Sequence, residues 1–383
     1  MSEELQRRAA DVDADRLLDE VVVVDDGGLG PELDDDISLE MNEVVGLSQS
    51  QIVRRRFFRH RGAMISLAVL IMIVVLAITS VGYGPIPGWW KWEPGQLVPK
   101  VPGNGGPTMS FRPTWLGGAG IKLGDHPFGV DNELGKDMFA QTMRGVQTSL
   151  TVILVLGVLA TSIGVVVGAL SGYYGRWIDS ALMRFTDVVI VMPLLVITAV
   201  AGFALDLAGI WPVAVALGIF TWTGLARLVR AEFLALRERE FVDAARVANA
   251  SDRRIIFRHI LPNTVGTIIV SVTLLMGAGI LTESALGFLG FGVRAPEVSL
   301  GTLVNDYDGA YETRPWLFIW PGVFVIGIVL CLQFIGDGLR DAFDPRQKRI
   351  PRRKDLDRHG LVVAEDLEFR DLDPSTPSPG ASS

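Results

Sequence analysis

A run of about twenty residues without a charge, Gly62 to Tyr83, most constrains how this chain can fold. A helix rises about 1.5 Å per residue, so a helix of that length crosses the roughly 30 Å hydrocarbon core of a bilayer. The run lies about sixty residues into the chain and has no clear small-residue cleavage site, which favours a membrane helix over a signal peptide. Five arginines precede it and indicate a cytoplasmic start: Arg54, Arg55, Arg56, Arg59 and Arg61.

Further apolar stretches predict, with the first, an all-α integral membrane protein of six transmembrane helices. They lie near Ser149 to Leu170, Arg184 to Leu205, Pro212 to Phe233, Asn263 to Leu289 and Trp316 to Phe334. A hydrophobic fraction of 49% beside 20% charged residues suits a membrane protein with soluble ends. Basic residues collect at alternate connections, whereas 206–211 carries no Lys or Arg. This alternation predicts that both termini are cytoplasmic.

The segments outside the helices differ in composition. Residues 1–50 are rich in Asp and Glu and predict a mostly disordered acidic cytoplasmic tail. After a basic flank and the first helix at 51–84, residues 85–140 are rich in Gly, Pro and Trp and predict a long extracytoplasmic loop of turns or short strands. The core at 141–340 holds five helices and a cytoplasmic loop at 236–263. Residues 341–383 predict a second cytoplasmic tail with a disordered distal part, and its basic start is typical of a flank beside membrane lipid.

Motifs that would make this chain an enzyme are missing from the sequence. A phosphate-binding loop needs glycines followed by Lys and Ser or Thr, and the nearest string, Leu134 to Asp137, has neither the upstream glycine nor the hydroxyl residue. No H-E-x-x-H or G-x-S-x-G string occurs, and the single cysteine, Cys331, lies in an apolar run and predicts packing. We therefore expect no catalytic, metal or cofactor site. The charge pattern reports membrane topology and gives no reason to expect nucleic acid as a partner.

Three residues leave open a role as a transporter or channel that acts alone. A secondary transporter or channel that acts alone would normally carry ionisable residues in several spans, and Glu283 is the one mid-span candidate, with Asp187 near an inner edge. Helix packing or capping is the alternative role of both residues and is favoured over a transport role. Glu283 and Phe288 are kept as candidates for the pathway or gate. A membrane-anchored scaffold that acts through its tails is a further alternative.

The stretch from Glu238 to Val265 is polar and amphipathic between two apolar spans, which places it outside the bilayer as helix rather than loop. Helical spacing puts four small or apolar residues on one side and three charged ones toward the other: Phe241, Ala244, Ala245 and Ala248 against Glu240, Asp243 and Arg246. Asn249 to Ser251 should interrupt the helix, with Ser251 as N-cap of a second helix that Leu261 and Pro262 end before the next span. The alternative is a linker resting on lipid head groups.

This stretch resembles the cytoplasmic loop of binding-protein-dependent ABC importer permeases. Their motif is Glu-Ala-Ala, three residues, Gly, then about nine residues to Ile-x-Leu-Pro. Here Asp243 stands for Glu before Ala244 and Ala245, and Asn249 stands for Gly, with Ile260, Leu261 and Pro262 close behind. Asn is the next-best residue for a left-handed turn, so we expect the bend to persist.

The resemblance extends to the C-type permeases of dipeptide and oligopeptide importers, whose relatives include nickel permeases. It covers 62–84 loosely and 124–346 closely. The matching strings run over His126 to Leu150, Gly172 to Pro193, Ile280 to Pro296 and Gly336 to Arg346. Gly287 replaces a usual Ser, and Leu300 replaces a usual Trp.

The resemblance implies a type I importer fold in the plasma membrane of a bacterium. It implies that the chain is half of a translocation pathway for peptides, or alternatively nickel, and that a second homologous permease supplies the other half. Two ATP-binding-cassette subunits would hydrolyse ATP with Mg, and an extracytoplasmic binding protein would deliver the cargo. The loop residues from Glu240 to Pro262 would couple the chain to an ATPase.

Overall fold

The structure, a computed structural model, describes residues 49–99, 101, 104–109, 124–131, 133–204 and 209–343. Nearly all of the acidic tail predicted at 1–50 and of the tail predicted at 341–383 lies outside these residues. Apart from the start of its first helix, every described residue belongs to one compact unit, Val53–Asp344. In order, its long helices are α4 (Gln49–Arg59), α5 (Arg61–Val81), α6 (Met138–Tyr174), α7 (Arg176–Val191), α8 (Leu194–Ala204), α9 (Ile210–Thr221), α10 (Thr223–Leu236), α13 (Leu261–Phe288) and α15 (Pro315–Phe343).

Five helical stretches are long and apolar enough to cross a membrane, and a sixth span is present if the bent pair α7 and α8 counts as one. The expected first helix is α5, which begins at Arg61 and ends at Val81. The span predicted near Arg184 to Leu205 corresponds to this pair, in which α7 and α8 meet at 78°. The bend falls at Met192 and Pro193, since the residue before a proline is pushed out of the helical region and Met192 is extended.

Helix α6 packs closely against α10 through a row of glycines one turn apart, Gly164, Gly168 and Gly172. A Cβ added at Gly168 would lie 2.5 Å from the carbonyl oxygen of Ala226, so any side chain there would push the helices apart. Small residues at such spacing let transmembrane helices approach to backbone contact. The row therefore fixes how α10, and the segment that follows it, lies on α6.

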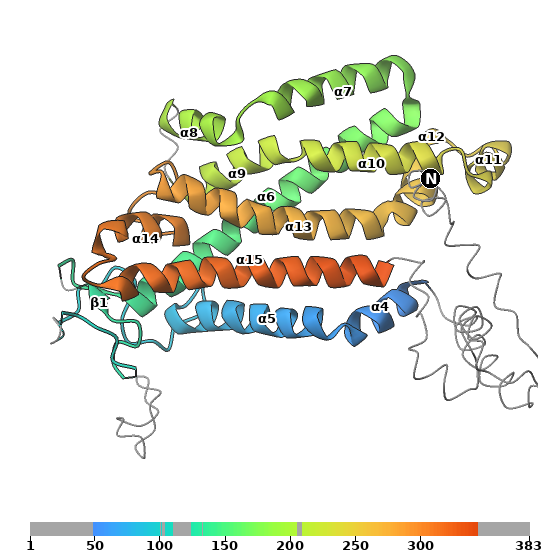
Figure 1. Cartoon of the computed structure of the whole chain (residues 1–383). Helices are drawn as coiled ribbons and strands as arrows, with labels where there is room; N and C mark the ends of the chain where they lie inside the picture. Colours follow the sequence, from blue (N-terminus) through green and yellow to red (C-terminus); the bar gives the residue numbers. More distant parts are fainter. Residues whose placement is uncertain are drawn as a thin grey trace, which may run out of the picture. The chain divides into compact units, whose positions relative to one another are not determined.

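Helices α5, α15 and α13 lie side by side, and α6 packs against both α5 and α13 (Figure 1). The main core cluster sits among these helices and joins apolar side chains of α5, α6, α13 and α15, including Ile73, Met143, Ile280 and Leu332. Many side chains on the outer faces are apolar and exposed, as in a protein whose solvent there is lipid.

One end of the unit holds the loop between α5 and α6 together with α14 (Leu300–Asp306) and the 3-10 turn η3 (Asp308–Ala310). Within this loop, β1 (Val130–Asp131) and β2 (Lys136–Asp137) form a small antiparallel hairpin (Figure 1). The prediction of turns and short strands in this region is confirmed for the described residues.

Candidate functional site

The central polar stretch folds as a helical bracket made of α11 (Glu240–Val247), α12 (Asp252–Arg254) and the π-helical turn η2 (Ile255–Ile260). Asn249 lies between the first two with φ 55°, so the expected left-handed turn is confirmed. The Asn249 amide donates to the Arg246 carbonyl at 2.9 Å and the Ala250 amide donates to the Ala245 carbonyl at 3.0 Å. These two bonds form the Schellman motif that ends many helices. Asn therefore takes the place that glycine fills in the related motif.

The predicted end of the second helix at Pro262 is wrong. Residues Asp252–Phe288 run as one continuous helical stretch of 37 residues, with Pro262 in the first turn of α13. A proline lacks the amide that a helix interior would need, but the preceding π-helical turn shifts the pattern, and the Leu261 amide donates to the Ile256 carbonyl. Ser251 does occupy the N-cap position, but its side chain makes no capping hydrogen bond. Its carbonyl instead accepts from the Ile255 amide at 3.0 Å.

The two sides of α11 differ in burial. Val242 and Ala245 are buried in a cluster with Phe233, Ile256 and Ile260. The expectation that Ala245 shares the outward face with the other alanines is therefore corrected, because it packs against α10 and η2. The remaining members of that face are exposed: Phe241, Ala244 and Ala248. The neighbouring Val247 is exposed as well, with 89% of its surface accessible. The bracket thus presents a small apolar face that no other described part of this chain covers.

The charged residues of the bracket hold it locally. Asp243 and Arg246 pair with each other at 2.9 Å on the exposed surface, while Glu240 lies in the first turn of α11. The Tyr173 hydroxyl at the end of α6 donates to an Asp252 carboxylate oxygen at 2.7 Å. The start of the long α12 to α13 stretch is therefore tied to α6.

Two ion pairs between α7 and α10 escaped the sequence reasoning, although charges of opposite sign in neighbouring apolar helices are a usable signal. Arg230 binds Asp179, and the Ser171 hydroxyl of α6 donates to the same carboxylate at 2.5 Å. Asp187, expected to serve packing or capping, pairs with Arg227 at 2.5 Å where both side chains are about half exposed. These pairs hold α7 against α10.

The two residues proposed for a pathway or gate do not share a surface. Glu283 is fully buried near the end of α13, where its Oε2 accepts from the Ser149 hydroxyl at 2.9 Å. Phe288, five residues further on, is 44% exposed. Glu283 consequently joins helices inside this chain, whereas Phe288 is free to face lipid or another subunit.

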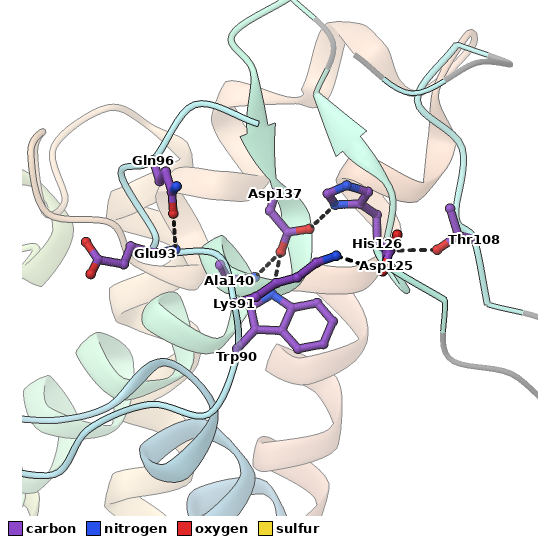
Figure 2. A network of polar contacts seen from close by, with 9 residues as sticks. All are labelled: Trp90, Lys91, Glu93, Gln96, Thr108, Asp125, His126, Asp137 and Ala140. Carbon is purple, nitrogen blue, oxygen red and sulfur yellow. Dashed lines mark hydrogen bonds and ion pairs between the residues drawn. The ribbon is translucent and has the colours of Figure 1, made fainter. Parts of the chain in front are cut away.

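A second polar network organises the loop before α6 (Figure 2). Asp137 is the N-cap of α6 and accepts hydrogen bonds from the Ala140 amide at 2.8 Å and the Trp90 indole at 3.1 Å. Its other oxygen lies 2.6 Å from Nδ1 of His126, which stacks on Trp92. Two tryptophans of this loop, Trp90 and Trp92, thus contact other residues of the loop and the start of α6. No sequence signal assigned this role to His126 or Asp137.

The neighbouring Asp131 is buried and ties the hairpin to the loop between α14 and α15. It accepts from the Tyr307 hydroxyl at 3.3 Å and from Arg314 at 3.2 Å. Burial, together with the Asp131 carboxylate, raises the pKa of Tyr307, so its phenol keeps the proton that it donates. Within the described ranges, no three His, Cys, Asp or Glu side chains gather closely enough to hold a metal ion.

A helical unit of five or six spans with an exposed helical bracket between two of them is the architecture of a membrane permease. The chain belongs to the family of binding-protein-dependent transport system inner membrane components, whose model matches residues 164–349. Residues 48–88 match the N-terminal transmembrane domain of oligopeptide transport permease C. It is a multi-pass inner-membrane transport subunit and not itself the catalytic component. Systems of this class also contain an ATPase and a binding protein.

Several bacterial relatives are similar over most of their length. The oligopeptide transport system permease protein OppC of Mycobacterium tuberculosis is 37% identical over 306 residues, which cover 80% of this chain and 97% of the relative. That of Haemophilus influenzae is 35% identical over 312 residues, covering 81% and 93%. The inward-facing MetNI methionine ABC transporter matches 54% of this chain and 97% of its own at 19% identity, with a TM-score of 0.45.

Proposed function

We propose that this chain is one of two homologous permease subunits that together form the pathway of an ATP-driven importer of oligopeptides or dipeptides. Peptide is favoured over nickel because relatives that are similar to the chain over most of their length are named as oligopeptide or peptide permeases. A binding protein on the outer side delivers the cargo, and two ATPase subunits on the inner side drive its release. ATP and Mg are handled by those subunits.

The exposed face of α11 is the single observation that carries the coupling role. Phe241, Ala244 and Ala248 are accessible although they are apolar or small, whereas Val242 and Ala245 hold the helix on the unit from the other side. Small side chains let a helix lie close to a partner surface, and a groove in an ATPase subunit is the partner that this face fits. The bracket at 236–263 then transmits the movement of the ATPases into the continuous stretch Asp252–Phe288.

The proposed topology places the bracket and both termini in the cytoplasm and the loop at 85–140 outside. It is supported by the arginines before α5 and the basic residues around the bracket, since cytoplasmic flanks carry an excess of Lys and Arg. The same topology puts the His126 and Asp137 network on the side where a binding protein docks.

Co-purification and reconstitution test this function. The tagged chain, purified in mild detergent from its native host, is expected to bring a second permease and ATPase subunits with it. The complex in proteoliposomes is expected to take up a labelled oligopeptide only when ATP and the binding protein are both present, and to leave nickel outside. Uptake by the chain alone, driven by an ion gradient, would contradict the proposal. Uptake of nickel would show that the cargo is nickel and not peptide.

A further inference from the structure

The helical stretch that begins in the bracket ends in a buried polar contact at the opposite end of the unit. Residues Asp252–Phe288 form one stretch of 37 residues, about 55 Å long at 1.5 Å per residue. Because α12, η2 and α13 follow one another without a break, a displacement at Asp252 is carried along the whole stretch. The side chain near its far end that is both ionisable and buried is Glu283.

A single hydroxyl at this end joins three helices. The Ser149 hydroxyl of α6 donates to Oε2 of Glu283 on α13 at 2.9 Å. Oγ of Ser149 in turn accepts a hydrogen bond from the amide of Leu300, the first residue of α14, at 3.2 Å. Glu283, Ser149 and the N-cap residue Ser299 are all fully buried. Removing this hydroxyl would leave a buried carboxylate and a buried amide without these partners, which is costly for both groups.

The helices around this contact touch backbone to backbone, so they cannot slide independently. A Cβ added at Gly301 of α14 would lie 2.6 Å from Cα of Ser284, and one added at Gly287 would lie 2.7 Å from the Gly301 carbonyl carbon. Any side chain at position 287 would therefore meet the backbone of α14. Ser299 and Thr302 also form a capping box that fixes the start of α14.

We propose that Glu283 and Ser149 form an outer pin that makes α14 move with the coupling stretch, so that Glu283 is a positioning residue of the transport cycle. The inference rests on the proposed function, in which α14 lies on the binding-protein side and the bracket on the ATPase side. Through this pin, a movement on the binding-protein side is transmitted to the ATPase side, because α14, α6 and α13 meet at one hydroxyl. Its removal separates binding of the outer partner from ATP hydrolysis without touching the ATPase contact.

The test uses the complete complex in proteoliposomes and measures ATP hydrolysis with and without the cargo-loaded binding protein. Glu283→Ala and Ser149→Ala are expected to keep the basal rate of ATP hydrolysis. The stimulation of that rate by the loaded binding protein is expected to fall about fivefold or more, the lower range of allosteric coupling. Glu283→Gln, whose amide oxygen can still accept from Ser149, is expected to recover most of it. Thr282→Ala is the matched control, because the Thr282 hydroxyl bonds only within its own helix, to the Ala278 carbonyl.

Each outcome decides the inference. Normal stimulation in an intact Glu283→Ala complex would overturn the pin and leave the proposed function standing. A wild-type chain that brings no ATPase with it would overturn the proposed function instead. A loss of stimulation in Thr282→Ala as large as that in Glu283→Ala, or failure of both Glu283→Ala and Ser149→Ala to assemble, would show a role in folding and would also overturn the pin.

Discussion

Arg230 of α10 binds the carboxylate of Asp179 on α7 through two parallel hydrogen bonds, Nε to Oδ1 at 2.5 Å and Nη2 to Oδ2 at 2.6 Å. This two-point geometry is among the strongest that side chains form. The arginine is 32% exposed and the aspartate 18%, so the pair is largely shielded from solvent. It is the better shielded of the two ion pairs that join α7 to α10 among the described residues.

The first prediction concerns the ion pair between Arg230 and Asp179. Asp179→Ala leaves a largely buried guanidinium without its partner and is expected to cost about 1 to 3 kcal/mol of stability. Asp187→Ala is the matched control on the same helix, because the Asp187 and Arg227 pair is about half exposed and pairs of that kind contribute roughly 0 to 1 kcal/mol. Thermal unfolding in detergent measures both, and equal shifts would contradict the difference in burial.

The second prediction concerns the turn of the bracket. Asn249→Val places a β-branched residue at φ 55° and is expected to cost about 1 to 2 kcal/mol, with less ATPase recovered in the purified complex. Asn249→Gly should preserve the turn, since glycine adopts this region freely. Ser251→Val, at an exposed position with a φ of -68° outside the apolar face of α11, controls for the added branched side chain. Normal assembly of the Asn249→Val protein would rule out a need for the left-handed turn.

The third prediction separates the two sides of α11. Ala244→Trp adds bulk to the exposed face and is expected to reduce ATP-driven uptake at least about tenfold, which corresponds to about 1.4 kcal/mol, while the chain still inserts. Ala245→Trp overfills the cluster beneath the helix and should lower the stability of the chain itself by about 1 to 3 kcal/mol. Ala181→Trp, on the exposed side of α7, is the control. Unchanged uptake by the Ala244→Trp protein would remove α11 from the coupling role.

The fourth prediction concerns Asp137, the N-cap of α6. Asp137→Ala removes the acceptor of the Ala140 amide and the Trp90 indole and the partner of His126, and is expected to cost about 1 to 3 kcal/mol. Protease sensitivity of the loop before α6 and thermal unfolding measure the effect. Asp125→Ala, whose carboxylate is exposed and paired with Lys91, should change either readout little. A larger effect at Asp125 would contradict the importance of the buried cap.

The fifth prediction gives the pH dependence of that exposed pair. A hydrogen bond from the Lys91 ammonium and its charge hold the pKa of the Asp125 carboxyl below the ordinary value of 3.8. A lowered folded-state pKa means that the contribution is complete above the ordinary value and is lost only as the pH falls through the lowered one. The contribution of the pair should therefore be the same at neutral pH and at about pH 5, where such a contribution only begins to fall. Lys91→Met is expected to change the stability equally at these two pH values. A difference that grows between these two values would contradict the assignment.

The apolar runs, the arginines before α5 and the turn at Asn249 were all readable in the sequence, because each depends on residues that lie close together in the chain. Hydropathy over some twenty residues identifies a span, and one residue type suffices to favour a left-handed turn. The family resemblance came from the same local strings, and the match over residues 164–349 confirms it.

The tertiary structure alone decided which polar side chains meet. Ser149 and Glu283 are separated by 134 residues, and Arg230 and Asp179 by 51, and their contacts depend on how each helix is rotated against its neighbour. The burial of Ala245 likewise follows from packing against α10 and η2. Local sequence sets which segments are helical, but the faces that pair are fixed by close packing between segments far apart in the chain.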